Sequence, residues 1–361
     1  NGIITATGGD YAAGIGGGYK SSGGKVIING GTVIATGGSN GAGIGGGAEG
    51  YYGEIIINDN AASINASGSF GGEDIGNGKF GEGATVIRHG DVKGVDLKDT
   101  ESEDIPVYTY IDENGEIQNT GTIAVTKLTQ DTDTLEAGWY IVEGVINRIS
   151  TFFESGSITV NGSVHLILAD NSILTITGWE AGINVIGENS LTIYAQSKGD
   201  GAGTLNVESI DNAAGIGSPF GSPAGKITIN GGIITAKGGE AAAGIGGGYT
   251  NFGGEIIING GRVTATGGYH AAGIGGGYHS LGEKIIINGG TVTATGGAAG
   301  GIIRSRGGGA GIGSGEEGVS GEISINGGII TATGGDYAAG IGGGYQNSGG
   351  NIIINNYPTV I

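Results

Sequence analysis

One phrase recurs through this chain at a fixed distance. It reads Asn-Gly-Gly-x-(Ile/Val)-x-Ala-x-Gly-Gly, followed by Ala-Gly-Ile-Gly-Gly-Gly and then by a run rich in Ile. A constant short period indicates one structural unit that is copied and stacked, because each copy is too small and too rich in glycine to bury a core alone. The Asn that opens a copy recurs after 29 residues at Asn29 and Asn58, Asn230 and Asn259, Asn259 and Asn288, and Asn326 and Asn355.

The glycine content admits two readings, a disordered low-complexity chain or a stacked solenoid. The chain has 88 Gly among 361 residues and only 6% aromatic residues, which is too few to pack an ordinary globule. Disorder goes with low hydrophobicity, whereas segments such as 255–258 and 284–287 are runs of Ile typical of strands. Collagen is excluded because Gly does not occupy every third position. The composition therefore favours the solenoid.

The pattern within a copy predicts which side chains point inward. The strand expected over 262–266 places Val263 and Ala265 on one face and three polar side chains on the other. The fold class expected is all-β, a right-handed parallel β-helix with about 29 residues per coil. We expect the opening Asn of each coil to adopt a left-handed turn conformation and its amide to stack in a ladder. The same inward pair recurs at Val33 and Ala35, Ile234 and Ala236, Val292 and Ala294, and Ile330 and Ala332.

Three regions are expected along the chain. Residues 1–88 form a first block of Gly-rich coils, and 89–157 form an acidic linker or cap region that lacks the repeat. Within this region Asn114-Gly115 lies between apolar alternations and predicts a β-hairpin. Residues 158–361 form a second solenoid block that starts with Gly-poor coils. In this block the step from Asn288 to Asn326 is 38 residues, so nine extra residues are expected to bulge out as a loop.

Charge and composition exclude several partners. The 15 basic and 34 acidic residues give a net charge of −19, which argues against binding to nucleic acid. The absence of Cys leaves no disulfide framework or thiolate chemistry. No apolar run is long enough to span a membrane, and no leader precedes the repeats. Residues 1–18 nearly duplicate 327–344, so we expect the chain to be a piece of a longer repetitive protein that carries export signals elsewhere.

The repeats resemble a family of large secreted or cell-wall proteins of Gram-positive bacteria. The same resemblance is carried by the segments Gly138-Trp-Tyr-Ile-Val-Glu-Gly144, Val164-His-Leu-Ile-Leu-Ala-Asp170 and Leu191-Thr-Ile-Tyr-Ala-Gln-Ser197. Members of this family are adhesin-like or carbohydrate-binding repeat proteins. The resemblance implies a parallel β-helix, an extracellular or cell-surface location and association with surface polysaccharides. It carries no catalytic motif onto this sequence and implies no cofactor.

Aromatic residues recur in two rows. Exposed aromatic rings in a line suit a polysaccharide, because sugar rings stack on flat apolar surfaces. The alternative is a stacking ladder that only stabilises the solenoid. The longer row follows the Gly-rich turn at Tyr19, Tyr249, Tyr278 and Tyr345, and the shorter row lies eight residues earlier at Tyr11, His270 and Tyr337.

Some residues of the repeats are also of the types used in catalysis, metal binding and ice binding, although ordinary surface roles account for most of them. A polysaccharide-active β-helix enzyme would need clustered carboxylates. His270 and His279 lie nine residues apart without a third metal ligand, so no metal site is expected. Thr-x-Thr segments such as 264–266 are typical of ice-binding solenoids, but Lys237 and Arg262 interrupt that face. The candidate acids are Asp10, Glu73, Asp74, Glu240 and Asp336, beside Arg304 and Arg306 of the extra loop.

Two functional hypotheses follow. The first is a noncatalytic extracellular structural or adhesive module that binds polysaccharide or other copies of itself. The second is a glycoside hydrolase or lyase whose site lies on the extra loop and neighbouring coils, and ice binding is a remote third possibility. Repeated near-identical coils provide a multivalent surface, whereas an enzyme concentrates its irregularities at one cleft. The sequence therefore favours the first hypothesis.

Overall fold

Alternating apolar residues form short parallel strands throughout the computed structural model, and no helix occurs among the residues it describes. The chain divides into two compact units, Asn1–Val107 with Gly121–Ala124, and Tyr108–Thr120 with Val125–Ile361. Each is a solenoid in its own right. The structure describes residues 3–21, 24–28, 31–50, 53–57, 61–81, 85–88, 106–151, 155–250, 254–281, 283–301, 307–355 and 359–360.

The first unit consists of three parallel sheets of three strands each. Each coil contributes one strand to every sheet, and partner residues such as Ile15 and Ile44 are 29 positions apart. The sheets are β1 (Ile3–Thr7), β4 (Gly31–Thr36) and β7 (Ala61–Ser67); β2 (Ile15–Gly16), β5 (Ile44–Gly45) and β8 (Ile75–Gly76); and β3 (Gly24–Ile28), β6 (Gly53–Ile57) and β9 (Thr85–Arg88).

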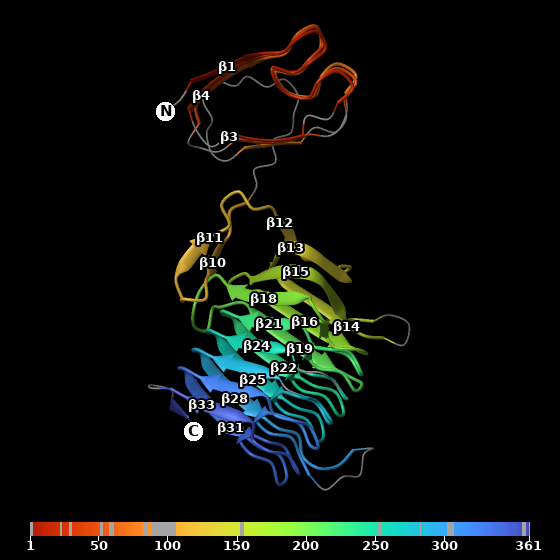
Figure 1. Ribbon diagram of the computed structural model, residues 1–361, viewed down its shortest axis with the longest axis vertical. Coiled ribbons are helices and arrows are strands. Elements are labelled where there is room, and N and C mark those ends of the chain that lie inside the picture. The colour runs from red at the N-terminus through yellow and green to blue at the C-terminus, as the bar shows by residue number, and fades with distance from the viewer. Residues whose placement is uncertain are drawn as a thin grey trace. The chain divides into compact units, whose positions relative to one another are not determined.

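The second unit repeats this plan over more coils, and its strands stack along the solenoid axis (Figure 1). One parallel sheet contains β14 (Val145–Ile149), β16 (Ile173–Gly178), β19 (Thr204–Ser209), β22 (Ile233–Lys237), β25 (Arg262–Thr266), β28 (Thr291–Thr295), β31 (Ile329–Thr333) and β34 (Thr359–Val360).

The other two faces of the second unit meet at the long strand β15 (Ile158–Leu168), which pairs with one strand of each face. One face contains β18 (Ser190–Ala195), β21 (Lys226–Ile229), β24 (Glu255–Ile258), β27 (Lys284–Ile287), β30 (Glu322–Ile325) and β33 (Asn351–Ile354). The other contains the two-residue strands β17 (Ile183–Asn184), β20 (Ile216–Gly217), β23 (Ile245–Gly246), β26 (Ile274–Gly275), β29 (Ile312–Gly313) and β32 (Ile341–Gly342).

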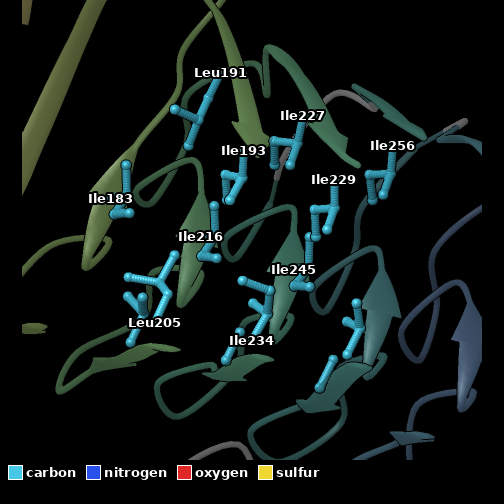
Figure 2. Close-up of a cluster of buried hydrophobic side chains, with 14 of the residues drawn as sticks. Ile183, Leu191, Ile193, Leu205, Ile216, Ile227, Ile229, Ile234, Ile245 and Ile256 are labelled. Carbon is cyan, nitrogen blue, oxygen red and sulfur yellow. The ribbon is translucent and has the colours of Figure 1, made fainter. Parts of the chain in front are cut away.

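Aliphatic side chains fill the interior in rows, as the repeat predicts. Val263 and Ala265 are fully buried and pair in register with Val292 and Ala294 of the next coil. Figure 2 shows the same arrangement in earlier coils, where Ile216, Ile227, Ile234 and their neighbours project into one continuous core. The parallel β-solenoid of 29-residue coils is thus confirmed, and its stability comes from apolar burial repeated from coil to coil.

The predicted Asn ladder is present in the second unit. Each side-chain amide donates to the amide oxygen of the preceding Asn over 2.6–2.7 Å, in the series Asn230, Asn259, Asn288, Asn326 and Asn355. The expected left-handed conformation of the Asn is wrong. After the first four Asn of this series, the second glycine adopts it instead, with φ of 82–95° at Gly232, Gly261, Gly290 and Gly328. A glycine carries this conformation without the cost that a Cβ would impose.

The region 106–149 contains strands of its own. At the Asn114-Gly115 signal, β10 (Thr109–Ile111) and β11 (Ile117–Asn119) pair antiparallel. β12 (Val125–Lys127) and β13 (Thr134–Val142) extend the face of β15, since β13 pairs with β15 in parallel. Much of the acidic segment, residues 89–105, lies outside the described residues.

An aromatic cluster forms where the hairpin packs against the solenoid. Trp139 stacks on His165 with ring centroids 4.4 Å apart, and Tyr110 meets Tyr194 at 4.9 Å. Burial lowers the pKa of His165 and raises the pKa of Tyr194 to about 12, so both rings stay neutral near pH 7. This cluster covers the first coils of the unit with large side chains.

The nine extra residues of the long coil enter between β28 and β29. From the end of β28 at Thr295 to the start of β29 at Ile312 the chain advances 17 residues. The corresponding step in the preceding coil, from the end of β25 at Thr266 to the start of β26 at Ile274, is eight residues. The register is unaffected, since Ile274 pairs with Ile312 and Ile285 with Ile323. The insertion is therefore confined to a turn, as predicted.

Candidate functional site

A row of aromatic rings follows the Gly-rich turn of consecutive coils in the second unit. The centroids of Phe220 and Tyr249 are 5.2 Å apart, and those of Tyr249 and Tyr278 are 5.5 Å apart with nearly parallel planes. Phe220 is 58% exposed, whereas Tyr278 is only 7% exposed. Each ring lies four residues after the Ile of a two-residue strand, so the coil period alone aligns them. Glu316 occupies this position in the next coil and ends the row.

A surface hollow joins Phe220 at the end of this row to Trp179, which lies in an adjacent turn. The hollow has a volume of about 320 Å³ and is lined by Trp179 and Phe220 together with Glu180, Asp211, Asn212 and Ser222. Trp179 is 46% exposed, and its indole nitrogen donates to the Thr151 carbonyl over 3.0 Å. That hydrogen bond fixes the ring while leaving a face accessible. We call Trp179, Phe220, Tyr249 and Tyr278 the aromatic track.

A second depression, of about 700 Å³, is also lined by Trp179. Its charged lining residues are Asp131, Asp133, Glu180 and Arg148. Arg148 is almost fully buried and donates to Asp133 over 2.5 Å and to the Gly156 carbonyl over 3.1 Å. Arg148 also donates to the carbonyls of Gln130 and Ser157, so its guanidinium is held by four groups of the fold and joins the segments that line this depression.

The other aromatic residues predicted as ligand contacts form separate pairs. Tyr337 and Tyr345 have centroids 5.9 Å apart, and Tyr337 is 83% exposed. In the first unit, Tyr11 and Tyr19 have centroids 5.3 Å apart and are each nearly half exposed. Both pairs present aromatic surface, but neither continues into a neighbouring coil as the aromatic track does.

His270 is placed differently from the prediction. Its side chain is fully buried, which corrects the expectation of an exposed ring and removes it from any ligand-binding surface. Nδ1 lies 2.5 Å from Glu316 Oε2 and 2.7 Å from the Gly307 carbonyl, and Nε2 lies 2.7 Å from the Gly300 carbonyl. Because a carbonyl oxygen only accepts hydrogen bonds, Nε2 donates to Gly300, and Nδ1 lies between the Gly307 carbonyl and the Glu316 carboxyl group. His279 meets Glu317 at 3.3 Å, so the two histidines do not share a ligand.

The base of the inserted loop is fixed by these contacts. Besides the two carbonyls bound by His270, the Ala299 amide donates to Asp336 Oδ2 over 3.0 Å and the Gly308 amide donates to the Asp336 carbonyl over 2.7 Å. Arg304 and Arg306, which were predicted as functional residues of this loop, lie outside the described residues.

The candidate catalytic acids mostly hold turns. Asp74 accepts from the Gly68 amide over 2.8 Å, Glu73 from the Asn77 amide over 2.5 Å, and Asp10 from the Ser39 hydroxyl over 3.3 Å. Asp336 holds the inserted loop as described. The structure brings no two of these acids together in a described contact, and Glu240 belongs to a different coil from Asp336.

The sequence prediction missed Trp179 and Phe220. Both lie in coils whose turns depart from the Gly-rich phrase, since Ser218-Pro219 replaces Gly-Gly before Phe220. Alignment on the strand rather than on the phrase places Phe220 four residues after Ile216, in the row of Tyr249. The signal was therefore available for Phe220, whereas Trp179 lies in an adjacent turn with no repeated counterpart.

A search of the described residues for a helix long and apolar enough to cross a bilayer yields no candidate. The chain matches no curated protein and no solved structure. Five segments match the family model described as beta helix repeat, at residues 1–19, 26–48, 227–249, 256–278 and 323–345. The last three of these each run from an Ile-rich strand to an aromatic residue after the Gly-rich turn. These segments are thus similar to the beta helix repeat, and the structure shows the parallel β-helix architecture that this description names.

Proposed function

We propose that this chain is a noncatalytic extracellular repeat module that binds polysaccharide along the aromatic track. The observation that carries the proposal is the hollow in which two exposed aromatic rings, Trp179 and Phe220, stand beside carboxylate, amide and hydroxyl groups. Sugar rings present apolar faces and polar edges, so a site for them combines flat aromatic surface with hydrogen-bonding groups. Tyr249 continues the surface into the next coil, which suits a polymer rather than a single sugar.

The proposal includes two further expectations. The chain is located outside the cell, and it also binds other copies of itself. The location rests on the resemblance to Gram-positive cell-wall repeat proteins. Stacked coils hold their turns at a fixed spacing, so weak contacts to successive sugar units would add along the rod.

The test is binding of the purified chain to a panel of polysaccharides, with Trp179→Ala and Phe220→Ala as variants. We expect each variant to weaken binding at least about tenfold, because loss of a stacked aromatic ring costs on the order of 1–3 kcal/mol by analogy with base stacking. Phe80→Ala is the matched control, since Phe80 is 77% exposed and belongs to the first unit. Unchanged binding in both track variants would contradict the proposal.

One observation favours a second candidate, a polysaccharide-active enzyme. Asp131, Asp133 and Glu180 line the depression next to Trp179, and acid pairs beside a bound sugar are the groups that hydrolyse glycosidic bonds. Release of reducing sugar from a bound polymer, abolished by Glu180→Gln, would replace the noncatalytic proposal with this one. Absence of turnover on polymers that bind would support the noncatalytic module.

A further inference from the structure

A third cavity lies at the corner of the second unit that carries the Asn ladder, between this corner and the β10–β11 hairpin. It has a volume of about 360 Å³, within the range of small-molecule sites. Asn230 and Asn259 form part of its wall, and Ile111 and Gly115 of the hairpin contribute another part. It shares no lining residue with the hollow beside Trp179.

The charge of this cavity is opposite to that of the chain. Its lining contains Lys198 and Arg262 and no carboxylate, although the chain has 34 acidic and 15 basic residues. Lys198 donates to the Gly115 carbonyl over 2.9 Å, and Arg262 meets Asp200, just outside the lining, at 2.8 Å. The Lys198 ammonium uses one of its three hydrogens in this contact, and Arg262 uses one of its two terminal nitrogens. Both side chains therefore retain further hydrogen-bond donors.

Backbone donors add to the two cations. The amides of Gly232, Gly261 and Gly290 have no hydrogen-bond acceptor among the described residues, and all three glycines line the cavity. They occupy the same position in three consecutive coils, each with a left-handed φ. Gly232 is buried, and a buried amide without a partner is rare in proteins unless another molecule satisfies it. Successive backbone amides and cations of this kind form a site for anions.

We propose that this cavity binds the carboxylate of an acidic sugar, so that the module takes a uronate-containing saccharide at the Asn-ladder corner. Lys198 and Arg262 supply the charge, with the guanidinium suited to bidentate contact with a carboxylate. The free glycine amides supply neutral donors, and the side-chain amides of Asn230 and Asn259 meet sugar hydroxyls. A Cβ at Gly261 would approach the Gly232 carbonyl oxygen to 2.7 Å, so this wall requires glycine.

The test is titration of the whole chain with an oligomer of galacturonic acid, with the neutral galactose oligomer of equal length and with inorganic phosphate. We expect the uronate oligomer to bind, the neutral oligomer to bind at least about tenfold more weakly, and the affinity to fall as salt increases. Arg262→Ala and Lys198→Ala should each weaken uronate binding at least about tenfold, with Arg262→Lys retaining part of the affinity. Phosphate that binds as tightly as the uronate oligomer would overturn the assignment to a sugar.

Lys237→Ala is the matched control. Lys237 lies on the sheet that contains Arg262. It forms an exposed ion pair with Glu208, as Arg262 does with Asp200, but it does not line the cavity. Uronate affinity equally reduced by Lys237→Ala would show only a general effect of charge and would overturn the site. Trp179→Ala should leave uronate binding at this corner unchanged, so failure of the aromatic track and failure of the anion site are distinguishable. Melting of each variant, followed by circular dichroism, shows whether the fold is retained.

Discussion

The coil at residues 230–258 and the two coils that follow it share strands, register and core, yet differ in what their turns bury. In the second coil, His270 and Glu283 replace Ala241 and Gly254 of the first. In the third coil, Glu316 stands at the position of Tyr249. The three replacements are all buried, and two of them hold the base of the inserted loop. The comparison teaches that the strands tolerate a local irregularity because the turns adapt to it, at the expense of burying ionisable side chains.

Removal of one partner of the His270–Glu316 pair should have the largest effect. His270→Ala installs the residue of the regular coil but removes the imidazole from beside the buried Glu316 carboxyl group, and breaking a buried pair of this kind costs on the order of 3–5 kcal/mol. Hydrogen exchange of the amides in β26 and β29 measures the local free energy of opening. The double variant His270→Ala with Glu316→Tyr matches the regular coil at both positions. It should lose less than the sum of the single variants, and strictly additive losses would contradict the pairing.

Glu283 predicts a pH dependence that the regular coil lacks. Burial raises the pKa of its carboxyl from 4.5 to about 7, and neither carboxyl oxygen has a hydrogen bond by geometry. Between these values the folded chain holds a proton that the unfolded chain has lost. Stability is therefore full below pH 4.5 and falls as pH rises through 7, by on the order of 3 kcal/mol.

Urea denaturation between pH 4 and pH 8 measures this slope. Glu283→Gln and Glu283→Gly, the latter matching Gly254 and Gly321 of the neighbouring coils, should both remove most of it. A slope that persists unchanged in Glu283→Gln would show that another group carries the pH dependence.

The regular coil could be predicted from the sequence, and the adapted turns could not. The 29-residue period fixes which residues stack, so Val263, Ala265 and the Asn ladder follow from alternation and spacing alone. His270 aligns with Tyr11 and Tyr337, which are exposed, and its burial depends on the carbonyls of Gly300 and Gly307 in a loop that no other coil has. Trp179 was missed for a related reason, because its turn has no repeated counterpart that alignment could reveal.

The Asn ladder offers a way to sharpen the comparison across the insertion. Asn259→Ala removes one hydrogen bond to Asn230 and one from Asn288, and Asn288→Ala removes one to Asn259 and one from Asn326. At about 1 kcal/mol for each bond, both variants should lose about 2 kcal/mol. The bond from Asn326 to Asn288 spans 38 residues but has the same 2.7 Å length as the bonds that span 29. A much smaller loss for Asn288→Ala in urea denaturation would show that the insertion weakens the ladder.

The smallest effect on stability is expected at Glu255, whose pKa is shifted in the opposite direction to that of Glu283. Its carboxylate lies between Lys226 and Lys284 at 2.8 and 2.9 Å, and these contacts lower its pKa below 4.5. Here the folded chain stays charged where the unfolded chain gains a proton, so the contribution to stability is present above pH 4.5 and is lost as pH falls through the lowered value. Glu255→Gln should remove it, and 0.5 M salt should weaken it in the wild type, because the lysines are exposed to solvent. Denaturation of Glu255→Gln and Glu283→Gln over one pH range then separates the two coils by sign. Relative to the wild type, the first variant is less stable only above pH 4.5, whereas the second becomes the more stable as pH rises toward 7. The same sign in both variants would mean that the turn carboxyl and the strand carboxyl share one environment, and the contrast between regular and adapted coils would fail.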